Sequence, residues 1–238
     1  MQTIPLTQLL YMLVPLLVVA IVYSQWTGNK REIATATLRM SVQLIAIGYV
    51  LNILFSTNSL SLLAVLILVM LLSASLIARR NIHNKGTKTH LLILASIALG
   101  GTFNLAWVVW VVLDLDNVLE PRFIIPLAGM IYANAMNAIS LCAERYEKEI
   151  EQGQSLEKAR NIAFKTSLIP QVNSFLAVGF VSLPGMMTGQ ILSGIDPLIA
   201  VRYQIVVMAM ILSSGAMSNM IYLYTVGSRF FGRMGTLK

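Results

Sequence analysis

Long apolar segments alternate with short polar segments along most of the chain. The apolar segments lie near residues 4–23, 37–55, 60–78, 91–113, 123–142, 168–192 and 198–224. A helix needs roughly 20 consecutive apolar residues to cross the hydrocarbon core of a bilayer, and these segments have about that length. The pattern therefore predicts an all-α integral membrane protein with about seven transmembrane helices.

Two of these segments depart from a plain transmembrane pattern. Arg39 lies inside the second one, so we expect an amphipathic approach along the membrane surface from Glu32 that turns inward near Ser41. The sixth contains Pro184, and proline has no backbone N–H and clashes with the preceding helical turn. We therefore expect a break in the sixth segment near this proline.

The composition supports the same class of protein. Hydrophobic residues make up 57% of the 238 residues and charged residues 11%, whereas a soluble domain carries about 25% charged residues. Because the connections are short, residues 1–238 are predicted to form a single transmembrane domain. Cys142 is the one cysteine of the sequence, which excludes an intramolecular disulfide and iron–sulfur ligation by four cysteines.

Basic residues gather on one side of the predicted membrane. Fifteen of the 17 Lys and Arg residues follow the first, third, fifth and seventh apolar segments, and basic residues favour cytoplasmic loops. The N-terminus is therefore predicted outside and the C-terminus in the cytoplasm. The net charge of +7 then serves orientation and contact with anionic membrane lipid, and we predict no nucleic-acid partner.

The segment 144–170 is the longest polar stretch of the chain. Charged residues up to Glu151 continue the fifth helix, and Gly153 is suited to end it. Ser155 is suited to cap the next helix, with Glu157 in its first turn. This predicts a cytoplasmic hairpin of two helices over about 144–166, which is either a solvated connection or a docking surface for a soluble partner. The candidate docking residues are Glu151, Gly153, Ser155, Leu156, Glu157, Ala159 and Arg160.

The fifth apolar segment carries two side-chain amides at membrane depth. Asn134 and Asn137 occupy neighbouring positions on one helical face, and Met130 precedes them by one turn. Amides in hydrocarbon need hydrogen-bond partners. They are therefore either contacts between helices or the polar lining of a translocation path.

The sequence SLPGMMTGQILSGIDP, residues 182–197, interrupts the apolar pattern. Non-helical backbone at membrane depth is tolerated only where protein or water satisfies its polar groups. One interpretation is a broken or re-entrant segment on the translocation path, with Asp196 at its outer mouth. The alternative is a kinked helix and an outer loop in which Asp196 and Pro197 cap the last helix. The residues assigned to the path here are Pro184, Gly185, Met186, Met187 and Asp196.

The sequence offers no pattern for catalysis or nucleotide binding. It has no G-x-x-x-x-G-K-[ST] phosphate-binding loop, and no paired carboxylates lie inside an apolar segment. The chain is therefore predicted to be no enzyme, to bind no cofactor directly and to take its energy from another chain. Methionine sulfur is a soft metal ligand, but most of the 13 methionines are ordinary apolar bulk, and no metal site is assigned.

Three segments resemble one known family. IPLAGMIYANAMNAISL, LIPQVNSFLAVGFVSLPGMMTGQILSGIDP and VRYQIVVMAMILSS lie in this order between Ile125 and Ser214. They are similar to the bacterial FetB (YbbM) permeases, which are related to plant aluminium-tolerance permeases. The second segment contains Asn173, which the resemblance adds to the candidate lining residues of the path.

The resemblance implies the membrane subunit of an ABC transporter that exports iron. It further implies a homodimer in the inner (plasma) membrane that works with ATPase subunits of the FetA type, which bind ATP and Mg. Another cargo, such as UDP-glucose or a metal chelate, is the alternative, because a plant relative is linked to UDP-glucose. A lipid-facing scaffold without transport activity is an alternative from a different class.

Overall fold

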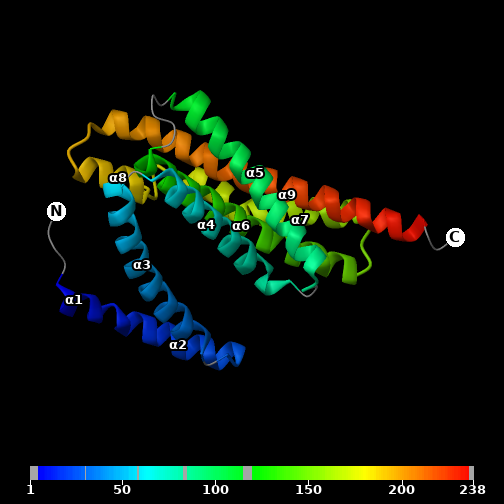
Figure 1. Ribbon diagram of the computed structural model, residues 1–238. Helices are drawn as coiled ribbons and strands as arrows, with labels where there is room; N and C mark the ends of the chain where they lie inside the picture. Colours follow the sequence, from blue (N-terminus) through cyan, green and yellow to red (C-terminus); the bar gives the residue numbers. More distant parts are fainter. Residues whose placement is uncertain (1–4, 30, 58, 83–84, 115–119, 236–238) are drawn as a thin grey trace. The chain divides into compact units, whose positions relative to one another are not determined.

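The computed structural model describes residues 5–29, 31–57, 59–82, 85–114 and 120–235. Within these ranges the regular structure is helical, apart from one isolated β-bridge between Val178 and Ser182. The predicted all-α class is therefore confirmed. The α-helices are α1 (Leu6–Tyr11), α2 (Leu13–Thr27), α3 (Glu32–Thr57), α4 (Leu60–Ala78), α5 (Thr87–Trp107), α6 (Pro121–Glu151), α7 (Leu156–Ala177), α8 (Gly185–Leu192) and α9 (Pro197–Gly235) (Figure 1).

Two short helices of other types extend this set. A 3₁₀-helix, η1 (Arg79–Asn81), follows α4, and a π-helix, η2 (Val108–Val112), continues α5. The backbone N–H of Leu113 donates to the carbonyl of Val108 over 2.9 Å, which is the wider hydrogen bond of a π-helix.

Six helices of the described chain are long and apolar enough to cross a membrane. α7 is not among them, because charged and amide side chains such as Lys165, Gln171 and Asn173 run through it. The predicted number of about seven is therefore not confirmed, and the predicted orientation of the termini stays a prediction. The six are Thr7–Thr27, Glu32–Thr57, Leu60–Ala78, Thr87–Val112, Pro121–Glu151 and Pro197–Gly227.

The expected surface approach before Ser41 is wrong. α3 is one continuous helix from Glu32 to Thr57. Two hydroxyls in this stretch bond inside the helix: the hydroxyl of Thr37 donates to the carbonyl of Ile33 over 2.9 Å, and the hydroxyl of Ser41 donates to the carbonyl of Thr37 over 3.0 Å. A polar stretch of this kind needs no separate segment on the membrane surface.

The chain divides into two compact units, residues 1–58 and residues 59–238. In the first unit, α2 ends at Gly28, which has a φ of 72°. Glu32 then joins the two helices, because its carboxylate oxygen Oε2 accepts from the Tyr23 hydroxyl and from the Asn29 side-chain amide, each over 2.8 Å. The predicted single transmembrane domain stays a prediction.

α6 is the central helix of the second unit (Figure 1). It packs against α4, α5, α7 and α9, and α8 packs against α9. The buried face of α6 is rich in small side chains, since Ala128, Ala135 and Ala138 are all fully buried. Small residues let neighbouring helices approach closely, so this face allows four helices to contact one.

The tightest contact in this unit lies between α5 and α9. A Cβ atom added at Gly100 would lie 2.8 Å from the backbone nitrogen of Ser218 and 2.7 Å from its hydroxyl oxygen. Backbone atoms cannot move aside without shifting the helix. Gly100 is therefore required by the distance between the two helices, which only a residue without a side chain permits.

Two further glycines lie at the same level. A Cβ added at Gly101 would lie 3.0 Å from the Tyr132 ring on α6, and one added at Gly215 would lie 3.1 Å from the Cβ of Ala138. Together with Gly100 they bring α5, α6 and α9 into mutual contact. We call this set of three glycines and their neighbours the glycine crossing.

Hydrogen bonds between helices flank the glycine crossing. The Asn104 side-chain amide on α5 donates to the Ser213 hydroxyl on α9. On the other side of α9, the Asn219 side-chain amide donates to the Ser167 hydroxyl on α7 over 2.8 Å. Such bonds between membrane helices contribute up to about 1–2 kcal/mol each, so they hold α9 against both neighbours.

Replacing Gly100 by alanine is expected to lower the stability of the second unit by about 1–3 kcal/mol, the usual effect of overpacking. The thermal unfolding midpoint of the purified protein in detergent measures this. Gly129→Ala is the matched control, because its added Cβ would meet only the flexible end of Met70, at 3.3 Å. An unchanged midpoint for Gly100→Ala would contradict the assigned closeness of α5 and α9.

Candidate functional site

The predicted turn between two helices is present, but the second helix is longer than the short one predicted up to about residue 166, since α7 runs from Leu156 to Ala177. α6 continues to Glu151, and Gly153 follows with a φ of 79°. The N–H of Gly153 donates to the carbonyl of Ile150, and the N–H of Gln154 donates to the carbonyl of Glu149, each over 3.0 Å. This pair of bonds is a Schellman motif, which ends a helix at a left-handed glycine.

The second helix of the hairpin begins with the predicted cap. The Ser155 hydroxyl accepts from the backbone N–H of Lys158 over 3.3 Å, and α7 starts at Leu156. Glu157 stands in the first turn, where the positive end of the helix dipole favours an anion. The connection is therefore a short capped turn between two ordered helices.

The base of the hairpin is held by packing and by one ion pair. Ala159 and Ala163 lie one turn apart on α7 and are both fully buried. On α6, a guanidinium nitrogen of Arg145 lies 2.6 Å from a carboxylate oxygen of Glu149, whose side chain is only 4% exposed. A buried carboxylate needs such a partner, so Arg145 is part of what allows α6 to stay helical up to Glu151.

The structure places the candidate docking residues in different environments. Ala159 is buried and is a packing residue of the hairpin rather than a surface residue. The half-buried ones are Leu156 and Arg160. The exposed ones are Glu151, Gly153, Ser155 and Glu157.

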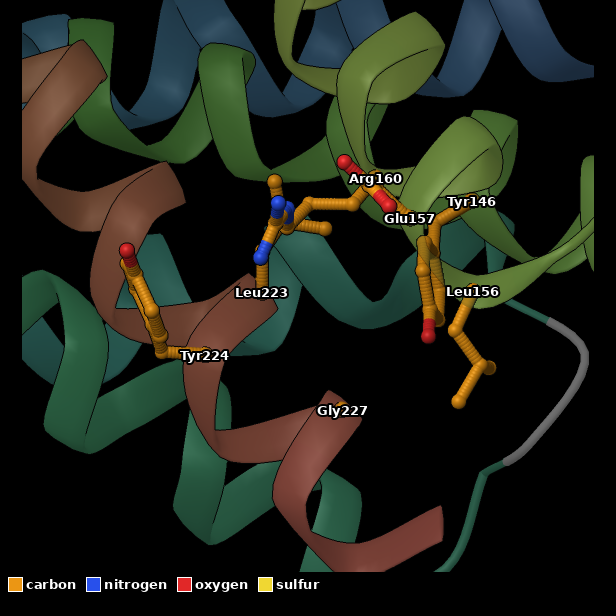
Figure 2. A pocket seen from close by; sticks show the side chains of 7 residues that line it. All are labelled: Tyr146, Leu156, Glu157, Arg160, Leu223, Tyr224 and Gly227. Carbon is orange, nitrogen blue, oxygen red and sulfur yellow. The ribbon is translucent and has the colours of Figure 1, made fainter. Parts of the chain in front are cut away.

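A pocket of about 390 Å³ opens beside the hairpin. Figure 2 shows that its walls come from α6, α7 and α9. The Arg160 side chain lies over the Tyr224 ring, with 5.8 Å between the guanidinium carbon and the ring centroid, which is within the range of a cation–π interaction. We call it the hairpin pocket; its lining residues are Tyr146, Leu156, Glu157, Arg160, Leu223, Tyr224 and Gly227.

Sequence reasoning missed four of these lining residues. Leu223, Tyr224 and Gly227 lie about 70 residues after the hairpin turn, and Tyr146 lies in a charged stretch that gives no sign of a cavity. Only the packing of α9 against α6 and α7 brings them together. No local signal in the sequence indicates this arrangement.

The candidate lining residues of α6 share one face that the second unit leaves partly open. Asn137 is exposed, and Met130 and Asn134 are half-buried. The Asn134 side-chain amide donates to the Met130 carbonyl over 2.8 Å, so this bond stays within α6. The Asn134 amide is thus bonded to its own helix, and this bond does not connect two helices.

The expected break near Pro184 is present and starts earlier than predicted. α7 ends at Ala177, and Gly179 follows with a φ of 88°. Pro184 precedes α8, a separate helix of eight residues that packs against α9. The chain thus forms a second short helix rather than one kinked helix.

Asp196 caps α9. One carboxylate oxygen of Asp196 accepts from the N–H of Leu198 over 2.8 Å and from the N–H of Ile199 over 3.4 Å. Pro197 is the first residue of α9, a position that suits its fixed φ and missing N–H. The predicted capping by these two residues is confirmed, and a re-entrant course of this segment in the membrane stays a prediction.

Of the remaining candidate path residues, Asn173 lies on α7 and the others lie in or next to α8. Pro184 and Met187 are half-buried, whereas the others are exposed: Asn173, Gly185, Met186 and Asp196. Within the described residues, no group of three or more His, Cys, Asp or Glu side chains is arranged to hold a metal ion. The available donors of the candidate path are amide oxygens, methionine sulfurs and one carboxylate.

Comparison with known proteins gives matches over nearly the whole chain. The sequence profile described as "Uncharacterised protein family (UPF0014)" matches residues 6–231. The "Probable iron export permease protein FetB" of Escherichia coli is 34% identical over 91% of this chain and 88% of its own length. No solved structure gives a match.

Further relatives come from cyanobacteria and plants. The "UPF0014 membrane protein slr1647" of Synechocystis is 33% identical over 92% of this chain and 91% of its own length. The "Protein ALUMINUM SENSITIVE 3" of Arabidopsis thaliana is 30% identical over 92% of this chain and 85% of its own length. The resemblance of the three segments to FetB permeases is thereby confirmed, and the chain belongs to the UPF0014 family of membrane proteins.

Proposed function

We propose that this chain is the membrane-spanning permease subunit of an ABC transporter that exports iron, and that a separate ATPase supplies the energy. The observation that carries this proposal is the ordered hairpin of α6 and α7 with its two capped helix ends. A permease without a nucleotide-binding loop needs a rigid surface on which an ATPase can act. The E. coli relative's description as a probable iron export permease supports the cargo.

The length of α6 supports a hairpin that stands clear of the membrane. At 1.5 Å per residue, its 31 residues span about 46 Å, whereas the hydrocarbon core is about 30 Å thick. The excess is at the charged C-terminal end, where Arg145, Lys148 and Glu151 lie. The helix therefore reaches water as a rigid continuation of a membrane span.

The glycine crossing favours a path on the surface of the second unit rather than through it. α5, α6 and α9 are in contact there, which leaves no route for cargo between these three helices. The exposed amide of Asn137 on an apolar helix needs water or protein around it. A second copy of the chain facing this surface of α6 would provide both, with the path between the copies in a homodimer.

The donor groups of the candidate path also suit a second class of cargo. Iron ions favour carboxylate or imidazole ligands, whereas the α6 face offers the neutral amides of Asn134 and Asn137. Neutral amides form hydrogen bonds with sugar hydroxyls and with chelates. A metal chelate or UDP-glucose is therefore the alternative cargo for the same architecture.

ATP hydrolysis by the co-purified complex with a FetA-type ATPase, reconstituted in lipid, is expected to rise when ferrous iron is added. Other divalent ions and UDP-glucose are tested in parallel. The permease chain alone is expected to hydrolyse no ATP. Stimulation by UDP-glucose and not by iron would replace iron as the proposed cargo. Hydrolysis of ATP by the lone chain would contradict the proposal that a separate ATPase supplies the energy.

Deleting residues 150–162 is expected to abolish binding of the ATPase, measured by co-purification. Lys158→Glu is a milder change than the deletion. Lys158 is exposed and lies in the first turn of α7. A carboxylate there favours the helix, so lost binding would not come from unfolding. Lys88→Glu, an exposed reversal at the start of α5, is the control. Unchanged ATPase binding by both hairpin variants would contradict the docking role.

Replacing Asn134 and Asn137 together by alanine is expected to reduce transport by at least about tenfold, the rate equivalent of losing about one hydrogen-bonding contact. ATPase binding is expected to stay normal. Transport is measured in proteoliposomes whose membrane contains the permease together with the ATPase. Leu141→Ala, an exposed apolar position on the same helix, is the control. Normal transport by the double variant would remove these amides from the path.

A further inference from the structure

The hairpin pocket has an apolar floor and a polar rim. Tyr146 and Leu223 are each 3% exposed and form the floor, whereas Tyr224 is 67% exposed and stands at the edge. Glu157 and Arg160 place one charge of each sign at the mouth (Figure 2). Protein interfaces have this composition at the places where one side chain of a partner is inserted, with an apolar centre inside a polar rim.

The size of the pocket fits one large side chain. An apolar cavity of about 150 Å³ is enough to bind benzene, and the hairpin pocket measures about 390 Å³. Pockets for whole small molecules range from about 300 to 1,000 Å³, so this one is near the lower limit. One aromatic or aliphatic side chain therefore fits with room to spare.

The surroundings of the pocket point to an occupant from water rather than from lipid. The charged side chains of Glu157 and Arg160 line it, and charged groups are costly inside hydrocarbon. An acyl chain would not reach a site surrounded in this way. A soluble protein that docks on the hairpin would lie directly over its mouth.

We propose that the hairpin pocket is a socket for one aromatic or aliphatic side chain that the ATPase partner inserts between α7 and α9. This inference rests on the proposed function, since it specifies how the same partner is held. The hairpin tip alone offers mainly exposed polar residues. The socket adds an apolar anchor, which is where interfaces concentrate their binding energy.

The position of the socket gives the inserted side chain a mechanical effect. Leu156 and Arg160 line it from α7, and Leu223 lines it from α9. Farther along the same two helices, the Asn219 side-chain amide donates to the Ser167 hydroxyl over 2.8 Å. A partner that pulls its side chain out, or pushes it in, acts on the seam between α7 and α9 that this bond closes.

Gly227 offers a direct way to fill the socket. It lines the pocket, and a Cβ added there would meet no atom within 4 Å. Leucine at this position has room in the folded chain and takes up part of the space that is open to the partner's side chain. Gly227→Leu is expected to weaken binding of a FetA-type ATPase by about 30-fold or more, the effect of losing an interface hot spot. Affinity is measured with the purified chain in lipid nanodiscs.

Two controls separate filling the socket from other effects. Gly227→Ala adds one methyl group and is expected to bind within about threefold of the unmodified chain, because most of the pocket stays empty. Gly48→Leu adds leucine to another helical glycine with open space around it, and is expected to bind normally. Thermal unfolding midpoints of all three variants are expected to stay close to that of the unmodified chain.

Labelling of a new thiol provides a second measurement. Cys142 is the one cysteine of the sequence and is fully buried, so Gly227→Cys adds an accessible thiol to a chain whose own thiol is shielded. A maleimide is expected to label it readily in the free chain. Bound ATPase is expected to slow this labelling by about tenfold or more, since an occupied interface core excludes solvent.

The outcomes distinguish the socket from the proposed function. Failure of the unmodified chain to bind the ATPase would contradict the proposed function and the socket with it. If the unmodified chain binds and Lys158→Glu weakens binding, the docking role of the hairpin stands. Normal binding by Gly227→Leu, or equal labelling of Gly227→Cys with and without ATPase, would then overturn the socket alone.

Discussion

The contact between α5 and α9 at Gly100 is the constraint on which the second unit depends. A Cβ at this position would lie 2.8 Å from a backbone nitrogen of Ser218, a separation that no side chain allows. Helices in lipid gain little from the hydrophobic effect and associate through close packing and hydrogen bonds. The glycine crossing provides the packing, and the bonds of Asn104 and Asn219 on either side provide the polar contacts.

The second unit is closed at the glycine crossing and remains open in two regions. One is the face of α6 that carries Asn137, and the other is the cytoplasmic end predicted for α6, α7 and α9. These regions lie on the same rigid helix, because α6 is continuous from Pro121 to Glu151. In our proposal, force applied at one end of α6 and α7 reaches the amide face through intact helix rather than through a flexible loop.

Local signals in the sequence predicted the local structure well. Gly153, Ser155 and Asp196 each have a short-range chemical reason for their place, and each ends or caps a helix as expected. The same reasoning failed for α3, because Arg39 was treated as an obstacle to a continuous helix. A single charged residue does not break a helix whose neighbouring hydroxyls bond to the helix's own carbonyls.

Features that depend on packing between distant segments could not be predicted from the sequence. The hairpin pocket combines Tyr146 with Leu223 and Gly227, which no motif connects. The predicted number of about seven spans is not confirmed for a related reason, since α7 is too polar to be counted by composition and yet packs against α6 and α9. Helix contacts, rather than hydropathy, place such a segment in the unit.

The sparse packing of the first unit has a consequence for how the sequence can change over evolution. α2 has no buried residue, and α3 buries only Leu54. An exchange of one aliphatic side chain for another in α2 or α3 removes almost no contact between these two helices, so packing within this unit leaves these positions free to change while their hydropathy is kept. The alanine face of α6 has no such freedom, because Ala128, Ala135 and Ala138 are fully buried inside the second unit.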